Sequence, residues 1–330
     1  MPNIFDVAAA AGVSHQTVSR FLKGDPTVRA ATRQRIEQAV AELGYRPNAA
    51  ARALASRRTR TIGLITVGLP LYGPSSTTHG FNHAARAAGW DVSIAVLEQA
   101  GAADVRHVLD ALLGQDVQAL VLVAPTPEVG DAVARVALDV PVVTTVPSGI
   151  PDAVAVGIDH RAAAALAVAH LADLGHREIL HVAGPEDWIE AQERERGWRE
   201  ECERRGLATP PVLRGDWTAQ GGAAIGRRLA ASGLPPAIFS ANDQTALGLL
   251  AAFAEAGVRV PGDVSVVGFD DIPEAAYFVP PLTTVRQDFA ALGERLMHRL
   301  AALLDGTDAD AAEPPTLPAE LVIRASTRPA

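Results

Sequence analysis

The chain has 330 residues, of which 48% are hydrophobic, 20% charged and 5% aromatic, with a net charge of −9. This composition excludes a disordered or fibrous protein, and no run of about 18 uncharged apolar residues is present to span a membrane. The single cysteine, Cys202, indicates a reducing cytoplasm. The single lysine, Lys23, excludes a lysine-dependent site beyond residue 23.

The first 60 residues differ in charge from the remainder. They contain 10 basic and 4 acidic side chains, a net charge of +6, which leaves −15 for residues 61–330. Basic side chains bind phosphates, whereas an acidic body is repelled from a duplex. The alternative is a solvated basic tail, but these charges are interleaved with structured motifs rather than gathered in low-complexity sequence. We therefore expect residues 1–60 to bind nucleic acid.

Three helices are predicted in this basic segment. The first covers residues 4–11 and ends at Gly12, and Ser14 can cap a second helix that runs to Leu22. A third helix over residues 30–43 places its apolar side chains on one face, which can cover the other two. A glycine turn between two helices is typical of a helix-turn-helix unit.

The second helix carries the candidate base-reading side chains. A helix-turn-helix unit reads major-groove edges from the N-terminal part of its second helix. His15, Gln16, Ser19 and Arg20 lie on the exposed side of that part. Gln16 suits adenine, and Arg20 suits guanine or a phosphate.

A very short helix follows the third one. Asn48 can cap residues 49–55, after the break at Arg46-Pro47. Seven residues are too few for a stable isolated helix, because nucleation costs more than two turns return. We expect this segment to fold only against another surface.

From residue 61 onward, apolar strands alternate with amphipathic helices in two series. The first series has strands at 61–67, 91–98, 119–124 and 141–146, and helices at 75–88, 103–113 and 127–137. The second series has strands at 178–183, 212–214, 237–241 and 264–269, and helices at 161–174, 192–205, 219–232 and 243–256. This alternation indicates two lobes, each a parallel sheet covered on both faces.

Polar and aromatic side chains follow several predicted strands of the second series. Asp270 and Asp271, Asn242 and Trp217 stand at such positions. Ligands of doubly wound sheets bind beyond the carboxyl ends of the strands, which places a site in the cleft between lobes. A carboxylate, an amide and an aromatic ring are suited to the hydroxyls and apolar faces of a sugar.

These residues also have simpler interpretations. Asp270 and Asp271 can be read as a catalytic acid and base, but they share one turn and leave no clear room for an attacking water. Trp217 can pack in a core, and Arg194 can lie on an exposed, salt-bridged helix face. No histidine is followed by Glu, and neither Gly-x-Gly-x-x-Gly nor Gly-x-Ser-x-Gly is present, so we expect no enzyme, cofactor or metal.

Four stretches of the basic segment resemble a known family. They are Asp6-Val7-Ala8, Ala11-Gly12-Val13-Ser14, Thr17-Val18-Ser19-Arg20 and Gly44-Tyr45-Arg46-Pro47-Asn48. Together they resemble the head of the LacI/GalR family of transcriptional regulators, and residues 61–330 resemble the core of that family. The resemblance implies an all-α helix-turn-helix head joined to an α/β periplasmic-binding-protein-like core of two doubly wound parallel-sheet lobes.

The resemblance also implies how the head binds DNA. In this family two hinge helices pair across a dimer and push a leucine into the minor groove, and Leu54 stands at the matching position. The alternative for Leu54 is ordinary packing in a helical linker. The positions that match DNA-contacting residues of the family are His15, Gln16, Thr17, Ser19, Arg20, Asn48, Ala51 and Leu54.

The resemblance implies an effector site in the cleft. Val146 departs from the pattern, because lactose-responsive members of the family have a sugar-binding aspartate there. Arg194, Asn242 and Asp270 match effector-contacting positions of the family as a whole. The remaining matches, which are to its lactose-responsive members in particular, are Pro74, Trp217, Gln287 and Phe289.

The implied organisation has three segments. Residues 1–45 form the DNA-binding domain, residues 46–60 the hinge helix and linker, and residues 61–330 the effector-binding and dimerisation core. Within the core, lobe 1 is expected to contain about 61–158 plus 289–330, and lobe 2 about 159–288. We expect a cytoplasmic homodimer rather than a tetramer, because no helical tail follows Arg324.

The implied function is repression of transcription at double-stranded operator DNA, with release by a sugar, a galactoside or related glycoside. One alternative is a purine-responsive repressor of the same family, because Trp217 and Arg194 can also flank a base. A solute-binding protein for transport is a further alternative. It requires an export signal and no DNA-binding head, and the sequence shows the opposite.

Overall fold

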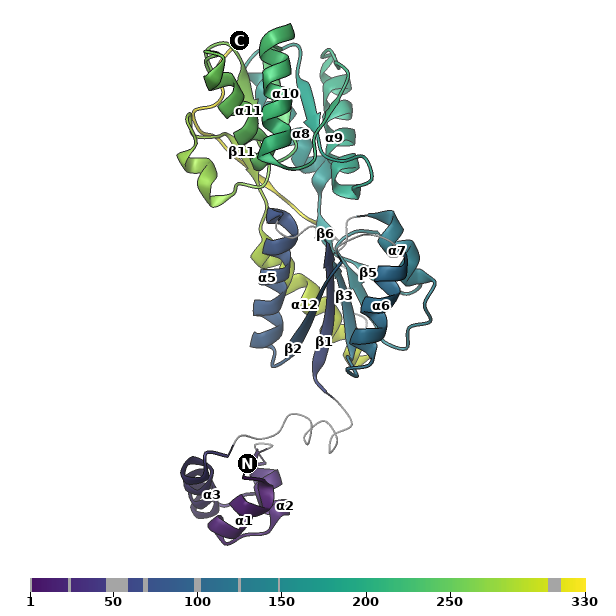
Figure 1. The fold of residues 1–330 in the computed structure, drawn as a ribbon, viewed down its shortest axis with the longest axis vertical. Coiled ribbons are helices and arrows are strands. Elements are labelled where there is room, and N and C mark those ends of the chain that lie inside the picture. The colour runs from purple at the N-terminus through teal and green to yellow at the C-terminus, as the bar shows by residue number, and fades with distance from the viewer. Residues whose placement is uncertain are drawn as a thin grey trace. The chain divides into compact units, whose positions relative to one another are not determined.

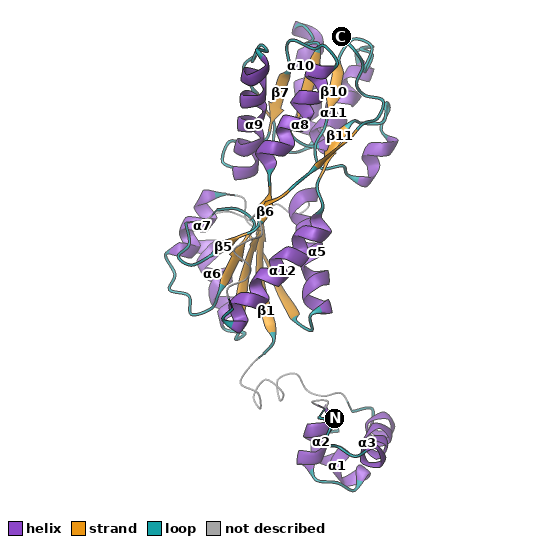
Figure 2. Ribbon diagram, turned by 180° about the vertical axis from the view of Figure 1, so that it is seen from behind, coloured by secondary structure: helices purple, strands orange, loops and turns teal. Residues whose placement is uncertain are grey.

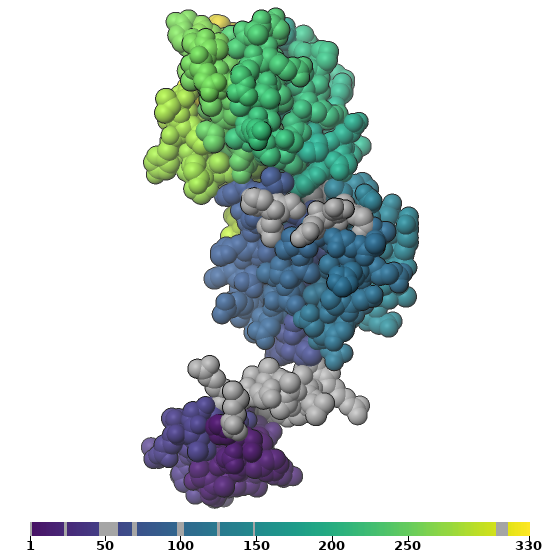
Figure 3. Space-filling view, viewed as in Figure 1, coloured from purple at the N-terminus to yellow at the C-terminus, as the bar shows by residue number. Residues whose placement is uncertain are grey.

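The computed structural model describes residues 2–22, 25–45, 59–67, 71–97, 102–123, 126–147, 149–307 and 316–330. Contacts divide the chain into two units, Met1–Arg60 and Thr61–Ala330. The second unit consists of two lobes, drawn in blue and in teal to green in Figure 3. No helix in the described ranges is long and apolar enough to cross a membrane.

The described part of the first unit, the head, contains three helices around a small core. Gly12 ends the first of them with a φ of 61°, a conformation that favours glycine. Val7, Val18 and Ile36, one from each helix, are fully buried against one another. The helices are α1 (Ile4–Ala11), α2 (His15–Leu22) and α3 (Ala30–Leu43), as the sequence predicts (Figure 1).

Lobe 1 is a parallel sheet between two layers of helices. Its elements are β1 (Thr61–Val67), α5 (Tyr72–Ala87), β2 (Asp91–Leu97), α6 (Ala102–Leu113), β3 (Ala119–Val123), α7 (Pro127–Ala134), β4 (Val142–Thr144), β5 (Val154–Ala155) and α12 (Phe289–Asp305). The strand order is β2-β1-β3-β4-β5. Leu120 and Leu122 pack toward α6 and α7, whereas Val121 and Val123 pack toward α5 and α12. The sheet is therefore buried on both faces.

Lobe 2 repeats this plan with a four-stranded sheet of order β10-β9-β7-β8 (Figure 2). Its elements are α8 (His160–Asp173), β7 (Leu180–Ala183), α9 (Ile189–Arg205), β8 (Leu213–Arg214), α10 (Ala219–Ser232), β9 (Ala237–Ser240), α11 (Asp243–Glu255), β10 (Ser265–Val267), the 3-10 helix η1 (Pro273–Tyr277), β11 (Thr284–Arg286) and β13 (Glu320–Val322). Trp198 and Phe239 are fully buried on the side of α8 and α9, and Phe253 on the side of α10 and α11.

Every strand and helix predicted from the alternating pattern coincides with an observed element, within three residues at each end. The elements that the pattern does not predict are short strands or late in the chain. They are β5, β6 (Gly157–Ile158), η1, β11, α12, β12 (Thr316–Leu317) and β13.

The C-terminal segment differs from the prediction. Strand β13 pairs antiparallel with β11 of lobe 2, so that Val322 lies opposite Thr284. The Ser326 hydroxyl donates to the carbonyl oxygen of Val266 at 2.6 Å, and the Ala330 N–H donates to Leu174 at 2.9 Å. The expectation that all of 289–330 belongs to lobe 1 is therefore wrong for residues 320–330. Backbone groups of β11 need partners, and this segment supplies them.

Close packing of α10 on α11 gives a testable prediction. A β-carbon at Gly248 would overlap the backbone of Ala219 and Ala223. We expect Gly248→Ala to lower the free energy of unfolding by about 1–3 kcal/mol, because the two helices must move apart. The control Leu247→Ala, on the exposed side of the same helix, should change it by no more than about 0.5 kcal/mol. Urea denaturation measures both, and equal losses would contradict the close-packing argument.

Candidate functional site

Helix α2 of the head has one buried face and one polar face. Val18 is fully buried. The Ser14 hydroxyl accepts a hydrogen bond from the backbone N–H of Thr17 at 3.2 Å, which fixes the start of the helix. The five candidates for reading bases are all exposed or partly exposed: His15, Gln16, Thr17, Ser19 and Arg20.

The other predicted DNA contacts are in the hinge. Asn48, Ala51 and Leu54 lie outside the described residues. Their roles, and the helix expected around them, stay predictions from the sequence.

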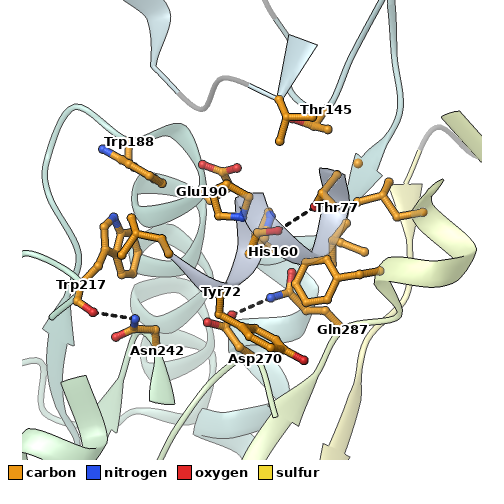
Figure 4. A pocket seen from close by; sticks show the side chains of 18 of the residues that line it. Tyr72, Thr77, Thr145, His160, Trp188, Glu190, Trp217, Asn242, Asp270 and Gln287 are labelled. Carbon is orange, nitrogen blue, oxygen red and sulfur yellow. Dashed lines mark hydrogen bonds between the residues drawn. The ribbon is translucent and has the colours of Figure 1, made fainter. Parts of the chain in front are cut away.

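A cavity lies between the two lobes of the core. Figure 4 shows side chains from both lobes around it. All seven side chains that the sequence analysis assigns to the effector site line it: Pro74, Arg194, Trp217, Asn242, Asp270, Gln287 and Phe289.

Three lobe 2 side chains, those of Trp217, Asn242 and Asp270, reach the cavity because they follow strands of one parallel sheet. Asn242 follows β9 and caps α11, where its side-chain oxygen Oδ1 accepts from the Thr245 N–H at 3.0 Å. Its amide nitrogen donates to the Trp217 carbonyl oxygen, also at 3.0 Å. Trp217 and Asp270 have φ values of 69° and 108°, which are strained for residues other than glycine. Such strain often marks functional sites.

Arg194 is the buried cation of the cavity. Its side chain points inward from α9 and the residue is 6% exposed, which contradicts the exposed-face interpretation. The guanidinium donates to the Ala241 carbonyl oxygen and lies 3.6 Å from the Asp270 carboxylate. It also lies over the Phe269 ring, 3.9 Å from the centroid. This charge is therefore held in one position by partners from three directions.

Asp270 faces Arg194 and is held by Gln287. The Gln287 amide nitrogen donates to the Asp270 carboxylate at 2.6 Å. Burial raises the pKa of Asp270 to about 6, although Arg194 and this hydrogen bond favour the charged form. The carboxylate keeps free acceptor capacity toward the cavity.

His160 is a cavity residue that the sequence analysis does not name. The Arg194 Nε donates to its Nδ1 at 3.3 Å. Burial lowers the pKa of His160 well below its usual value, and the charge of Arg194 lowers it further. His160 is therefore a neutral acceptor beside the cation rather than a general acid.

Further lining residues were also not predicted. Tyr72 lies at the start of α5, and Trp188 and Glu190 lie at the start of α9. Trp188 and Glu190 follow β7, so the rule that selects residues beyond strand ends would have found them. Nothing in the sequence pattern marks Tyr72.

Neighbouring acids have structural partners. Asp271 binds the guanidinium groups of Arg286 at 2.7 Å and Arg324 at 2.6 Å. Asp243 accepts from the Thr284 hydroxyl at 2.6 Å, and burial raises its pKa well above the usual value. Asp270 and Asp271 thus do not act as a paired acid and base. Within the described ranges, no group of three or more potential ligands is arranged to hold a metal ion.

Comparison with known families gives two matches. Residues 3–48 match bacterial regulatory proteins of the lacI family, and residues 168–327 match a periplasmic binding protein-like domain. The lactose operon repressor of Escherichia coli K12 is 36% identical over 327 residues, which are 98% of this chain and 90% of the repressor. These matches confirm the resemblance found in the head and core.

Solved structures agree. A crystal structure of the lac repressor dimer bound to operator and the anti-inducer ONPF has a TM-score of 0.89 at 35% identity, covering 99% of each chain. A complex of the transcriptional regulator CelR with cellobiose has a TM-score of 0.69 at 31% identity, covering 99% of this chain and 100% of the other.

The pKa of Asp270 gives a prediction about stability. The value of about 6 lies above the ordinary 3.8, so ionising this group in the folded state costs free energy. The cost is absent below about pH 4 and complete above about pH 6. Asparagine does not ionise. We therefore expect the unfolding free energy of Asp270→Asn, relative to that of wild type, to increase by up to about 3 kcal/mol when the pH is raised from about 4 to 7.5.

Urea denaturation at the two pH values measures this gain. Asp187→Asn removes an exposed carboxyl and serves as the control. A difference between Asp270→Asn and wild type that does not change with pH would show that the charged carboxylate is fully compensated in the fold.

Proposed function

The chain belongs to the LacI family of DNA-binding transcriptional repressors, and from this premise we propose that a sugar releases it from its operator. The proposed effector is a galactoside or related glycoside. The proposed active form is a homodimer in the cytoplasm that binds a pseudo-palindromic operator, one head to each half-site.

The observation that carries the proposal is the composition of the cavity. Arg194, Asn242 and Asp270 direct a guanidinium, an amide and a carboxylate into one volume, beside the rings of Trp217 and Phe289. Sugars present hydroxyls around apolar ring faces, and these groups complement both. The lactose operon repressor and the CelR–cellobiose complex, by their names, support a sugar as well.

The absence of an aspartate at position 146 bears on the sugar. Val146 is buried, 5% exposed, and it does not line the cavity, whereas Thr145 does. A hydroxyl at Thr145 can donate to or accept from a sugar but carries no charge. This difference favours a related glycoside over a strict match to the effector of the lactose operon repressor.

The proposed mechanism uses the position of the cavity between lobes. Phe289 and Leu292 belong to lobe 1, whereas Arg194 and Asp270 belong to lobe 2. A ligand that contacts both lobes favours one arrangement of them over others. We infer that this change is transmitted to residues 46–60, whose short predicted helix requires only about 1–3 kcal/mol of coupling to fold or unfold.

A ligand panel tests the effector class on the full chain. Bound ligand at about 100 times its Kd raises the free energy of unfolding by about 2.7 kcal/mol. We expect galactosides or other glycosides to raise the melting temperature and to release operator DNA, and Asp270→Ala to lose both responses. Asp270→Ala should still bind operator without sugar, and Asp187→Ala should respond as wild type does. A response to purines alone would contradict the sugar proposal.

A second experiment tests base reading by α2. A DNA site is first selected from random duplexes with the wild-type chain. Gln16→Ala removes a side chain suited to adenine, so we expect a loss of about 1–3 kcal/mol on the selected site and no loss on unrelated DNA. Gln38→Ala, an exposed glutamine on α3, is the control and should lose affinity for neither. Equal losses of Gln16→Ala on both DNAs would show a backbone contact instead.

A further inference from the structure

Two polar atoms in the cavity have no partner within the described residues. Glu190, in the first turn of α9, lines the cavity, and its Oε2 atom is buried without a hydrogen bond. The indole N–H of Trp217, which also lines the cavity, is buried without one as well. Unpaired buried donors and acceptors cost free energy, so most in folded proteins are satisfied. Their presence in one cavity indicates a ligand that supplies both partners.

Arg194 does not satisfy Glu190. The two residues are one helical turn apart, but the Arg194 guanidinium is already held by the Ala241 carbonyl oxygen and Asp270, and its Nε by His160. Burial raises the pKa of Glu190 to about 7 even though the charge of Arg194 opposes the rise. Its Oε2 atom therefore remains without a partner in the described residues, and it can accept from a ligand when the carboxyl group is ionised.

Trp188 adds an apolar surface beside this acceptor. It directly precedes α9, and its ring packs edge-on against Trp217, with 5.6 Å between the centroids and an angle of 64°. Figure 4 shows Trp188 and Glu190 across the cavity from Asp270 and Gln287. The cavity thus has a second group of binding side chains apart from the Asp270 group.

The chemistry of these atoms selects a hydroxyl-bearing ring. Glu190 needs a donor, and the Trp217 N–H needs an acceptor. An ammonium group serves only the first and a carbonyl only the second, whereas a hydroxyl is both donor and acceptor. The indole ring of Trp188 is suited to the apolar face of such a ring.

We propose that Trp188, Glu190 and the indole N–H of Trp217 form a second sugar subsite, so that the effector is a disaccharide rather than a single sugar. One ring binds at Asp270, Arg194 and Asn242, and the second binds at this subsite. The inference rests on the proposed function and narrows it, because it names the number of rings that the cavity recognises.

Calorimetric titration of the full chain with matched sugars tests the subsite. The pairs are lactose with methyl β-galactoside and cellobiose with methyl β-glucoside. We expect at least one disaccharide to bind ten times or more tightly than its one-ring partner. Glu190→Gln and Trp188→Phe should each reduce that ratio several-fold. The control is Glu193→Gln, which removes a carboxylate paired with Arg196 on the outer side of the same helix, and it should keep the wild-type ratio.

The outcomes separate the subsite from the proposed function. Equal affinity for both members of each pair, or an equal loss for both in Glu190→Gln and Trp188→Phe, overturns the second subsite and leaves a one-ring effector. If no sugar of either size binds the wild-type chain, the proposed function fails, and the subsite fails with it. Melting temperatures without sugar identify any variant that has lost its fold. If one of Glu190→Gln and Trp188→Phe is unfolded, the affinity ratio of the other tests the subsite.

Discussion

The burial of the Arg194 guanidinium is the constraint around which the cavity is arranged. A charge removed from water is tolerated only where hydrogen bonds and opposite charge replace the water. The Ala241 carbonyl oxygen, the Asp270 carboxylate and the ring of Phe269 do so. Asp270 is fixed in turn by Gln287, which follows β11. The positions of the side chains that face the ligand therefore depend on the charge of Arg194 and on the loops that surround it.

Much of this arrangement can be predicted from the sequence, because strands of a parallel sheet end at the same edge. Asn242, Trp217 and Asp270 follow predicted strands, so their approach to one cavity follows from the periodicity alone. Arg194 could be placed only by family resemblance. Its helix is rich in acids and arginines and looks exposed in sequence, and its burial results from packing against residues far along the chain.

Two physical reasons explain the elements that prediction missed. The pairing of β11 with β13 joins residues more than 30 positions apart, and each strand has only three residues. Such short strands carry too little periodicity to be recognised locally. Helix α12 is apolar on one face, but it follows the second series of strands and packs on the sheet of the first. The lobe on which α12 packs is determined by contacts with residues far away in the sequence rather than by any local pattern.

The return of α12 to lobe 1 affects how the protein folds during its synthesis. Lobe 1 lacks α12 until about residue 305 has left the ribosome, and lobe 2 lacks β13 and Ser326 until about residue 326 has left it. Each lobe therefore waits for a later segment before its packing is complete, even after all the strands of its parallel sheet have emerged. The head, whose described core is complete by Tyr45, can fold while the rest is still being made. Early termination of translation would thus release a folded DNA-binding head on an unfinished core.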